Sequence, residues 1–127
     1  MTYMNWEYYS SLYSMIPEDA FERLAKRASA KLDVYTHMRV LKFEKNYLEN
    51  TATDFQNQVH MQIQNTACEL AEGLYQQETT GMGTGIASVS NDGYSESYKI
   101  TTAAEQEVQL LAIVRNGLSG TGLAGAV

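Results

Sequence analysis

The sequence has few of the features that mark membrane, secreted or disulfide-bonded proteins. No apolar run in its 127 residues approaches the roughly 18 residues that a membrane-spanning helix needs. The first residues, MTYMNWEYY, lack the basic start and apolar stretch of a signal peptide, so we expect the protein to stay in the compartment where it is made. The single cysteine, Cys68, excludes a disulfide within the chain and fits a reducing compartment.

Basic residues are also scarce. Nine lysines and arginines stand against fifteen acidic residues, which gives a net charge of −6. Residues 1–50 are balanced, whereas residues 51–127 carry only Lys99 and Arg115 against eight acids, so the whole excess lies there. A protein that binds nucleic acid statically needs a net basic surface, and this composition excludes that class.

The residue groupings that catalysis or metal binding requires are missing too. His37 and His60 lie 23 residues apart without a helical HxxxH, a CxxC or an acidic cluster beside them, so we expect no metal. The stretch GMGTG has neither the spacing nor the preceding strand of a nucleotide-binding loop. With no nucleophile elbow and no paired carboxylates, we expect a protein that is not an enzyme, has no cofactor and works through contacts with other proteins.

The patterns that are present predict a mainly α fold, a small helical bundle in one domain. Residues 5–14 are expected to form a short helix with Asn5 as its N-cap and Trp6, Tyr9 and Tyr13 facing the core. A second helix follows Pro17. Its apolar stripe faces the core and its basic side faces either solvent or an acidic partner; the stripe comprises Phe21, Leu24, Ala25, Ala28, Leu32 and Tyr35. Residues 36–50 have mixed periodicity, and a loop with at most one helical turn is expected there.

Residues 52–78 form the longest periodic segment and predict one long central helix. Its stripe runs from Phe55 to Leu74, and Asn50, Thr51 or Thr53 is a suitable cap. A helix of this length would extend about 40 Å. The other helices offer too little surface to cover it, which is a first indication of oligomerisation.

A short β-hairpin is expected at about residues 86–99, after the glycine-rich connector TTGMGTG. The corner Asn91, Asp92 and Gly93 matches turns that need positive φ, and Tyr94, Glu96 and Tyr98 then project to one side. The exposed edges of such a hairpin can pair with a neighbouring subunit. These six residues are therefore our candidate subunit interface.

The last helix is expected to begin at Thr101 or Thr102 and to end at Gly117, a suitable C′ residue. It has two apolar stripes on opposite sides. The first, which includes Arg115, consists of Ala104, Val108, Leu111, Ala112 and Leu118, and the second, on the far side, consists of Leu110, Ile113 and Val114. We expect residues 1–117 to form the domain and residues 118–127 a flexible C-terminal tail that is disordered or becomes ordered on a partner. The candidate contacts with a partner or a neighbouring copy are Leu110, Ile113, Val114, Arg115, Leu118, Leu123 and Val127.

The order of these features resembles one known family over almost the whole chain. A short aromatic turn, NWEYYSSLY, precedes the helix PEDAFERLAKRASAKLDVYT, and a long helix then closes on ACELAEGLYQQE. SVSNDGYSESY follows, and the last helix ends in LSGTGL. The sequence resembles the head–tail connector (adaptor, or head-completion) proteins of long-tailed bacteriophages and related prophages. It departs from them in ending with AGAV, where such proteins often continue with aromatic and basic residues.

The resemblance implies a non-enzymatic virion protein, assembled in the bacterial host cytoplasm and located at the head–tail interface. It would form a ring of identical copies beneath the portal protein, extend the DNA channel and present a platform for the next connector or tail-completion protein. DNA would be transiting cargo only, and no membrane would be involved. The alternative interpretation is a small prophage-encoded helical binding module that acts on a host protein.

Overall fold

The computed structural model describes residues 2–81 and 103–124, and within these ranges every regular element is a helix. The mainly α fold predicted from the sequence is confirmed. The expected β-hairpin at residues 86–99 lies outside the described residues. In chain order the elements are α1 (Trp6–Leu12), α2 (Glu18–Tyr35), α3 (Arg39–Glu49), α4 (Asp54–Gln76), the π-helical turn η1 (Gln77–Gly81) and α5 (Ala103–Gly117).

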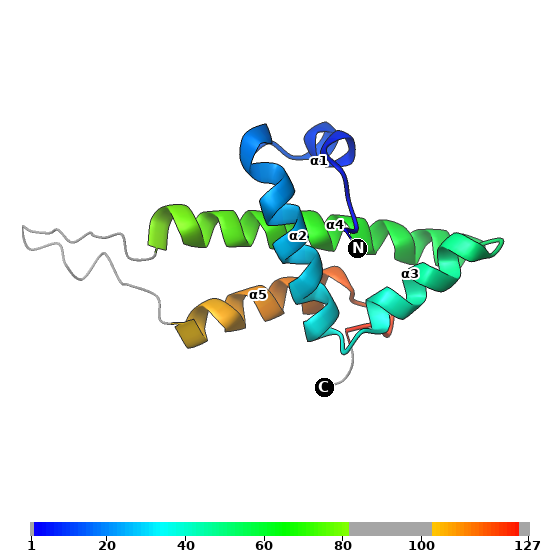
Figure 1. The fold of residues 1–127 in the computed structure, drawn as a ribbon. Coiled ribbons are helices and arrows are strands. Elements are labelled where there is room, and N and C mark those ends of the chain that lie inside the picture. Colours follow the sequence, from blue (N-terminus) through cyan, green and yellow to red (C-terminus); the bar gives the residue numbers. More distant parts are fainter. Residues whose placement is uncertain (1, 82–102, 125–127) are drawn as a thin grey trace, which may run out of the picture.

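The long helix α4 is the centre of the molecule. Thr53 caps its start in a reciprocal capping box, in which its side chain accepts from the backbone N–H of Gln56 and the Gln56 side chain accepts from the Thr53 N–H. Helix α2 crosses α4, and α5 runs alongside α4 (Figure 1). The long central helix is therefore confirmed, and it gives α2 and α5 a common surface on which to pack.

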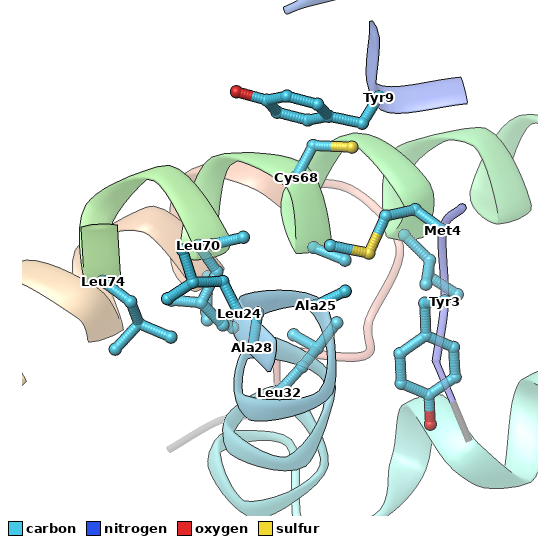
Figure 2. Packing of buried hydrophobic residues seen from close by; sticks show 14 of the residues in the cluster. Tyr3, Met4, Tyr9, Leu24, Ala25, Ala28, Leu32, Cys68, Leu70 and Leu74 are labelled. Atoms are coloured by element: carbon cyan, nitrogen blue, oxygen red, sulfur yellow. The ribbon is translucent and has the colours of Figure 1, made fainter. Parts of the chain in front are cut away.

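The core lies where α2 crosses α4 (Figure 2). Leu24 and Leu32 of α2 are fully buried, as is Leu70 of α4. Small residues lie between these large side chains, which lets the two helices approach closely. Full burial of each leucine contributes about 1.5–3 kcal/mol, so the crossing accounts for much of the stability.

The N-terminal segment packs onto this core through its tyrosines. Asn5 caps α1 by accepting from the backbone N–H of Tyr8, as expected. Tyr9 is fully buried; its hydroxyl donates to Glu72 Oε2 at 2.8 Å and accepts from the N–H of Ile16 at 2.8 Å. Burial is the main cause that raises the pKa of Tyr9 to about 12. Because the hydroxyl has both partners, Tyr9 joins α1, the following turn and α4.

Helix α3 corrects the expectation of a loop at residues 36–50. Val40 is fully buried and Phe43 and Tyr47 are half-buried, at spacings of three and four residues. This apolar stripe of α3 was hard to recognise in the sequence because Glu44, a residue type that is usually exposed, also lies on the buried face. A tight turn with positive φ at His37 and Met38 joins α2 to α3.

Helix α5 packs on α4 through its second stripe, Leu110, Ile113 and Val114. Leu110 and Val114 are buried, whereas Ala104, Val108 and Ala112 of the other stripe are exposed. The reason is the shape of α4 at Gly73: a β-carbon there would lie 2.9 Å from Ile113 Cδ1 and 3.2 Å from Leu110 Cδ2. The missing side chain leaves room for these larger residues.

The segment after α5 is not a free tail as far as the structure describes it. Leu118 is fully buried, and Leu123 packs against the core. The Gln62 side chain of α4 donates to the carbonyls of Gly117 and Ser119 at 3.2 and 3.1 Å. The expected boundary at residue 117 is therefore wrong, because residues 118–124 belong to the packed domain.

Candidate assembly surfaces

An open groove forms where the end of α2, the last turns of α5 and the segment after α5 come together. Its volume is about 240 Å³. Val34 on its wall is 65% exposed. The groove is lined by Val34, Tyr35, His37, Leu111, Arg115 and Ala124. It joins apolar side chains to one cation, a combination that is typical of a protein-binding surface.

A polar contact between α2 and α5 holds one side of this groove. Glu107 accepts hydrogen bonds from the Tyr35 hydroxyl and, at 3.0 Å, from Lys31 Nζ. The Tyr35 hydrogen bond, together with Lys31, lowers the pKa of Glu107 below its usual range. At neutral pH this carboxylate is therefore charged and ties the two helices together beside the groove.

The structure divides the predicted contact residues of α5 and its tail into three groups. Leu110, Val114 and Leu118 are buried in the chain's own core, so the prediction that they contact another chain is wrong. Ile113 and Leu123 are half-buried against that core. Arg115 is exposed and lines the groove, without an ion-pair partner among the described residues. Val127 and the six hairpin residues Asn91, Asp92, Gly93, Tyr94, Glu96 and Tyr98 lie outside the described residues.

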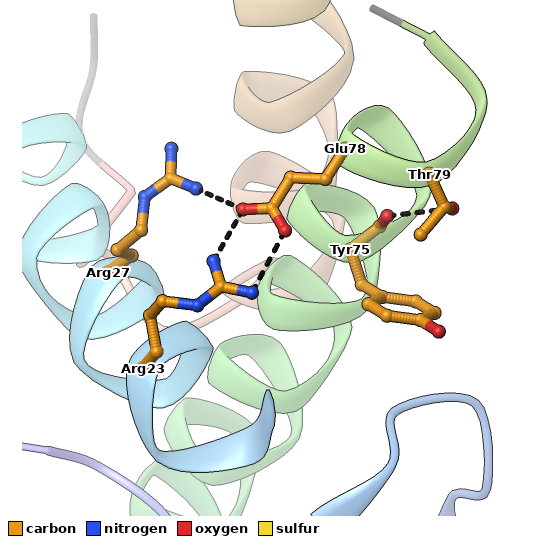
Figure 3. Close-up of polar contacts among 5 residues, drawn as sticks. All are labelled: Arg23, Arg27, Tyr75, Glu78 and Thr79. Carbon is orange, nitrogen blue, oxygen red and sulfur yellow. Dashed lines mark hydrogen bonds and ion pairs between the residues drawn. The ribbon is translucent and has the colours of Figure 1, made fainter. Parts of the chain in front are cut away.

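Two arginines of α2 hold the turn η1 at the end of α4 (Figure 3). Arg23 binds both carboxylate oxygens of Glu78, at 2.7 and 3.1 Å, and Arg27 binds one of them at 2.7 Å. The hydrogen bond from Arg23 is the largest cause that lowers the pKa of Glu78. Part of the basic side of α2, expected to face solvent or a partner, thus pairs within the chain.

A second polar cluster fixes α3 against α4. Glu44 is buried, and its Oε2 lies 2.7 Å from Nδ1 of His60. The ring of Tyr47 stacks on His60 with 4.3 Å between centroids. A buried carboxylate needs such a partner. The cluster is therefore structural, and it explains why an acid lies on the apolar face of α3.

The described residues contain no group of three or more histidine, cysteine or acidic side chains placed to hold a metal ion. In the same residues no helix is both long and apolar enough to cross a bilayer. Cys68 is fully buried, and burial, with Glu72 and Glu69 nearby, raises the pKa of its thiol to about 12. At neutral pH it is protonated and inaccessible, as expected of a structural thiol.

Comparison of the chain with protein-family models, with curated proteins and with solved structures finds no match. The resemblance described above therefore rests on the sequence features themselves.

The groove was not expected from the sequence, although one signal pointed to it. Val34 falls outside the stripe of α2 that runs from Phe21 to Tyr35, so it is an apolar residue on the polar side of an amphipathic helix. Such a residue is a candidate for exposure. Nothing in the sequence indicated that α5 would place Leu111 and Arg115 beside it.

Proposed function

We propose that this protein is a head–tail connector of a long-tailed bacteriophage or related prophage. Copies of the chain form a ring beneath the portal protein, extend the DNA channel and present a platform for the next connector or tail-completion protein. Its place is the head–tail interface of the virion. It carries no catalytic activity.

The observation that carries this proposal is the position of the segment LSGTGL. This segment bears much of the resemblance, and residues 118–123 pack along the core so that Ala124 lines the groove. The segment after α5, which we propose as a partner contact, therefore ends beside a groove where Val34 and Arg115 are exposed. The acidic excess of residues 51–127 also supports the proposal, because DNA slides past an acidic channel without sticking.

Electron microscopy of the protein mixed with the portal protein of the same phage or prophage tests the proposal. We expect an added ring of density on one face of the portal. Portal alone and this protein alone serve as controls. A mixture in which the portal is unchanged, or a complex with a bacterial host protein in place of the portal, would overturn it.

A matched pair of variants tests the groove. Val34→Asp places a charge in the groove and is expected to weaken portal attachment in a pull-down, without unfolding the chain, because Val34 is 65% exposed. Phe55→Asp is the control, since Phe55 is 62% exposed and lies at the first turn of α4, away from the groove lining. Equal attachment of both variants would exclude the groove as the portal-binding surface.

A further inference from the structure

The corner where α1 joins α2 presents an exposed surface that is both apolar and acidic. Leu12 is 60% and Met15 40% exposed. Glu18 and Asp19 follow at the start of α2, exposed and without an ion-pair partner among the described residues. No lysine or arginine occurs in residues 2–22. We call Leu12, Met15, Glu18 and Asp19 the corner surface.

Helix α3 presents the opposite chemistry. Lys42 and Lys45 are exposed and have no ion-pair partner among the described residues. Met38 and Leu48, before them and after them, are 53% and 63% exposed. We call Met38, Lys42, Lys45 and Leu48 the α3 surface. It is apolar and carries a net positive charge. Of the two acids of α3, Glu44 is buried against His60, and Glu49, the last residue of the helix, is exposed and offsets only one of the two lysines.

These two surfaces belong to opposite ends of α2. The corner surface includes its first residues, whereas α3 begins just beyond its last residue. A helix of 18 residues is about 27 Å long. Figure 1 shows α1 and the start of α2 on one side of α4, and the end of α2 with the start of α3 on the other. One copy of the chain therefore cannot bring its own two surfaces together.

We propose that the corner surface of one copy docks on the α3 surface of the next copy; this inference rests on the proposed ring-forming function. Each surface offers two exposed apolar side chains and two like charges, and the charges of the two surfaces are opposite. A surface meeting its own kind would place like charges together, which disfavours a symmetric pair. A contact between two different surfaces repeats head to tail and closes into a ring when the rotation permits.

The contact is weak when it is made only once. Its charges are exposed, so salt screens them and each pair contributes little. Repetition around a closed ring multiplies the effect. The opposite charges mainly set the orientation and register of neighbouring copies.

Zero-length carbodiimide cross-linking at high protein concentration tests the pairing directly, because the reagent joins only amines and carboxylates that touch. We expect cross-links from Lys42 or Lys45 to Glu18 or Asp19. Mixing nitrogen-14 and nitrogen-15 protein identifies them by mass spectrometry as links between copies. Lys42→Arg with Lys45→Arg keeps the charge but removes the reactive amines, and it should abolish these links alone. If none of these links forms between copies in the wild-type protein, the inference is overturned.

Charge reversal tests the same pairing energetically. Lys42→Glu with Lys45→Glu, and separately Glu18→Lys with Asp19→Lys, should each lower self-association at low salt about tenfold in sedimentation velocity. The chain with all four substitutions keeps the net charge of −6, because the changes of −4 and +4 cancel. It should regain self-association. If it does not, or if the two-substitution variants associate normally, the pairing is wrong.

Portal attachment, measured separately, keeps this inference distinct from the proposed function. A wild-type protein that forms the cross-links but does not attach to the portal would overturn the function and leave the pairing in place. A protein that attaches to the portal without these cross-links would overturn the pairing and leave the proposed function in place.

Discussion

At the scale of single residues, Gly117 is the point where the backbone of α5 comes close to the Thr66 side chain of α4. A β-carbon built on it would lie 2.1 Å from Oγ1 of Thr66, which is itself buried and donates to the carbonyl of Gln62. From the sequence, Gly117 was expected to be the C′ residue, a position that commonly has positive φ. In the structure, positive φ occurs instead at Gly120 and Gly122, and Gly117 serves close packing.

Gly117→Ala is therefore expected to lower the free energy of unfolding by about 1–3 kcal/mol, the usual range for an overpacked core. Urea denaturation measures this. Gly73→Ala is the matched control: its β-carbon would meet the flexible end of Ile113 at 2.9 Å, and alanine favours the helix, so the net change should be smaller. Equal losses from both substitutions would contradict the packing argument at Gly117.

The pair formed by Glu44 and His60 leads to a second prediction. His60→Ala leaves the buried carboxylate without the partner that lies 2.7 Å away, and should lower the free energy of unfolding by about 1–3 kcal/mol. Adding Glu44→Met removes the unpartnered carboxylate and should recover part of the loss. Chemical denaturation of the two variants measures both changes. A double variant less stable than His60→Ala alone would show that the unpartnered buried carboxylate is not the cause of the loss in stability.

At the scale of elements, side chains that look like surface charges determine how the helices are held together. Arg23 and Arg27 bind Glu78 in η1, and Lys31 binds Glu107 in α5. Periodicity places all four basic residues of α2 on one polar side, but it does not show which of them meets an acid from a distant element. That depends on the crossing of α2 over α4.

The contact of Glu78 with α2 predicts a dependence on acid pH. Its folded-state pKa is lowered from the usual 4.5, so its contribution to stability is present above pH 4.5 and is lost as the pH falls through the folded-state value. Glu78→Gln should melt at a slightly lower temperature at pH 7 and lose less stability on acidification. Thermal melts at decreasing pH measure this, with Glu22→Gln as control because its pair with Lys26 is longer, at 3.5 Å, and more exposed. An acid profile identical to wild type would contradict the prediction.

At the scale of the whole molecule, the part of the chain after α5 belongs to both the core and the proposed partner surface. Leu118 is fully buried, and Ala124 lines the groove six residues later. A flexible tail at residues 118–127, as expected from the sequence, could be deleted without loss of the fold. The burial of Leu118 changes that expectation.

Deletion of residues 118–127 should now lower the free energy of unfolding by about 2–5 kcal/mol, as for other losses of a buried leucine. Deletion of residues 125–127 removes no contact that the structure describes, and is the control that should melt like the full chain. Circular dichroism melts of both chains measure what the segment contributes to the stability of the core. A portal pull-down of both chains measures what it contributes to partner binding. Wild-type stability in the longer deletion would show that Leu118 contributes nothing to the core.

The sequence by itself determined the helical class, the stripe of α2 and the cap of α1, and it narrowed the cap of α4 to three residues, of which Thr53 is the one used. These features depend on local spacing and local hydrogen bonds, which can be read along the chain. Only the tertiary structure decided which stripe of α5 is buried, where Glu44 finds its partner and which residues line the groove. Each of these depends on how closely α2, α3 and α5 can approach α4. Small residues such as Gly73 set that distance, but which side chains they make room for is decided only when the helices pack together.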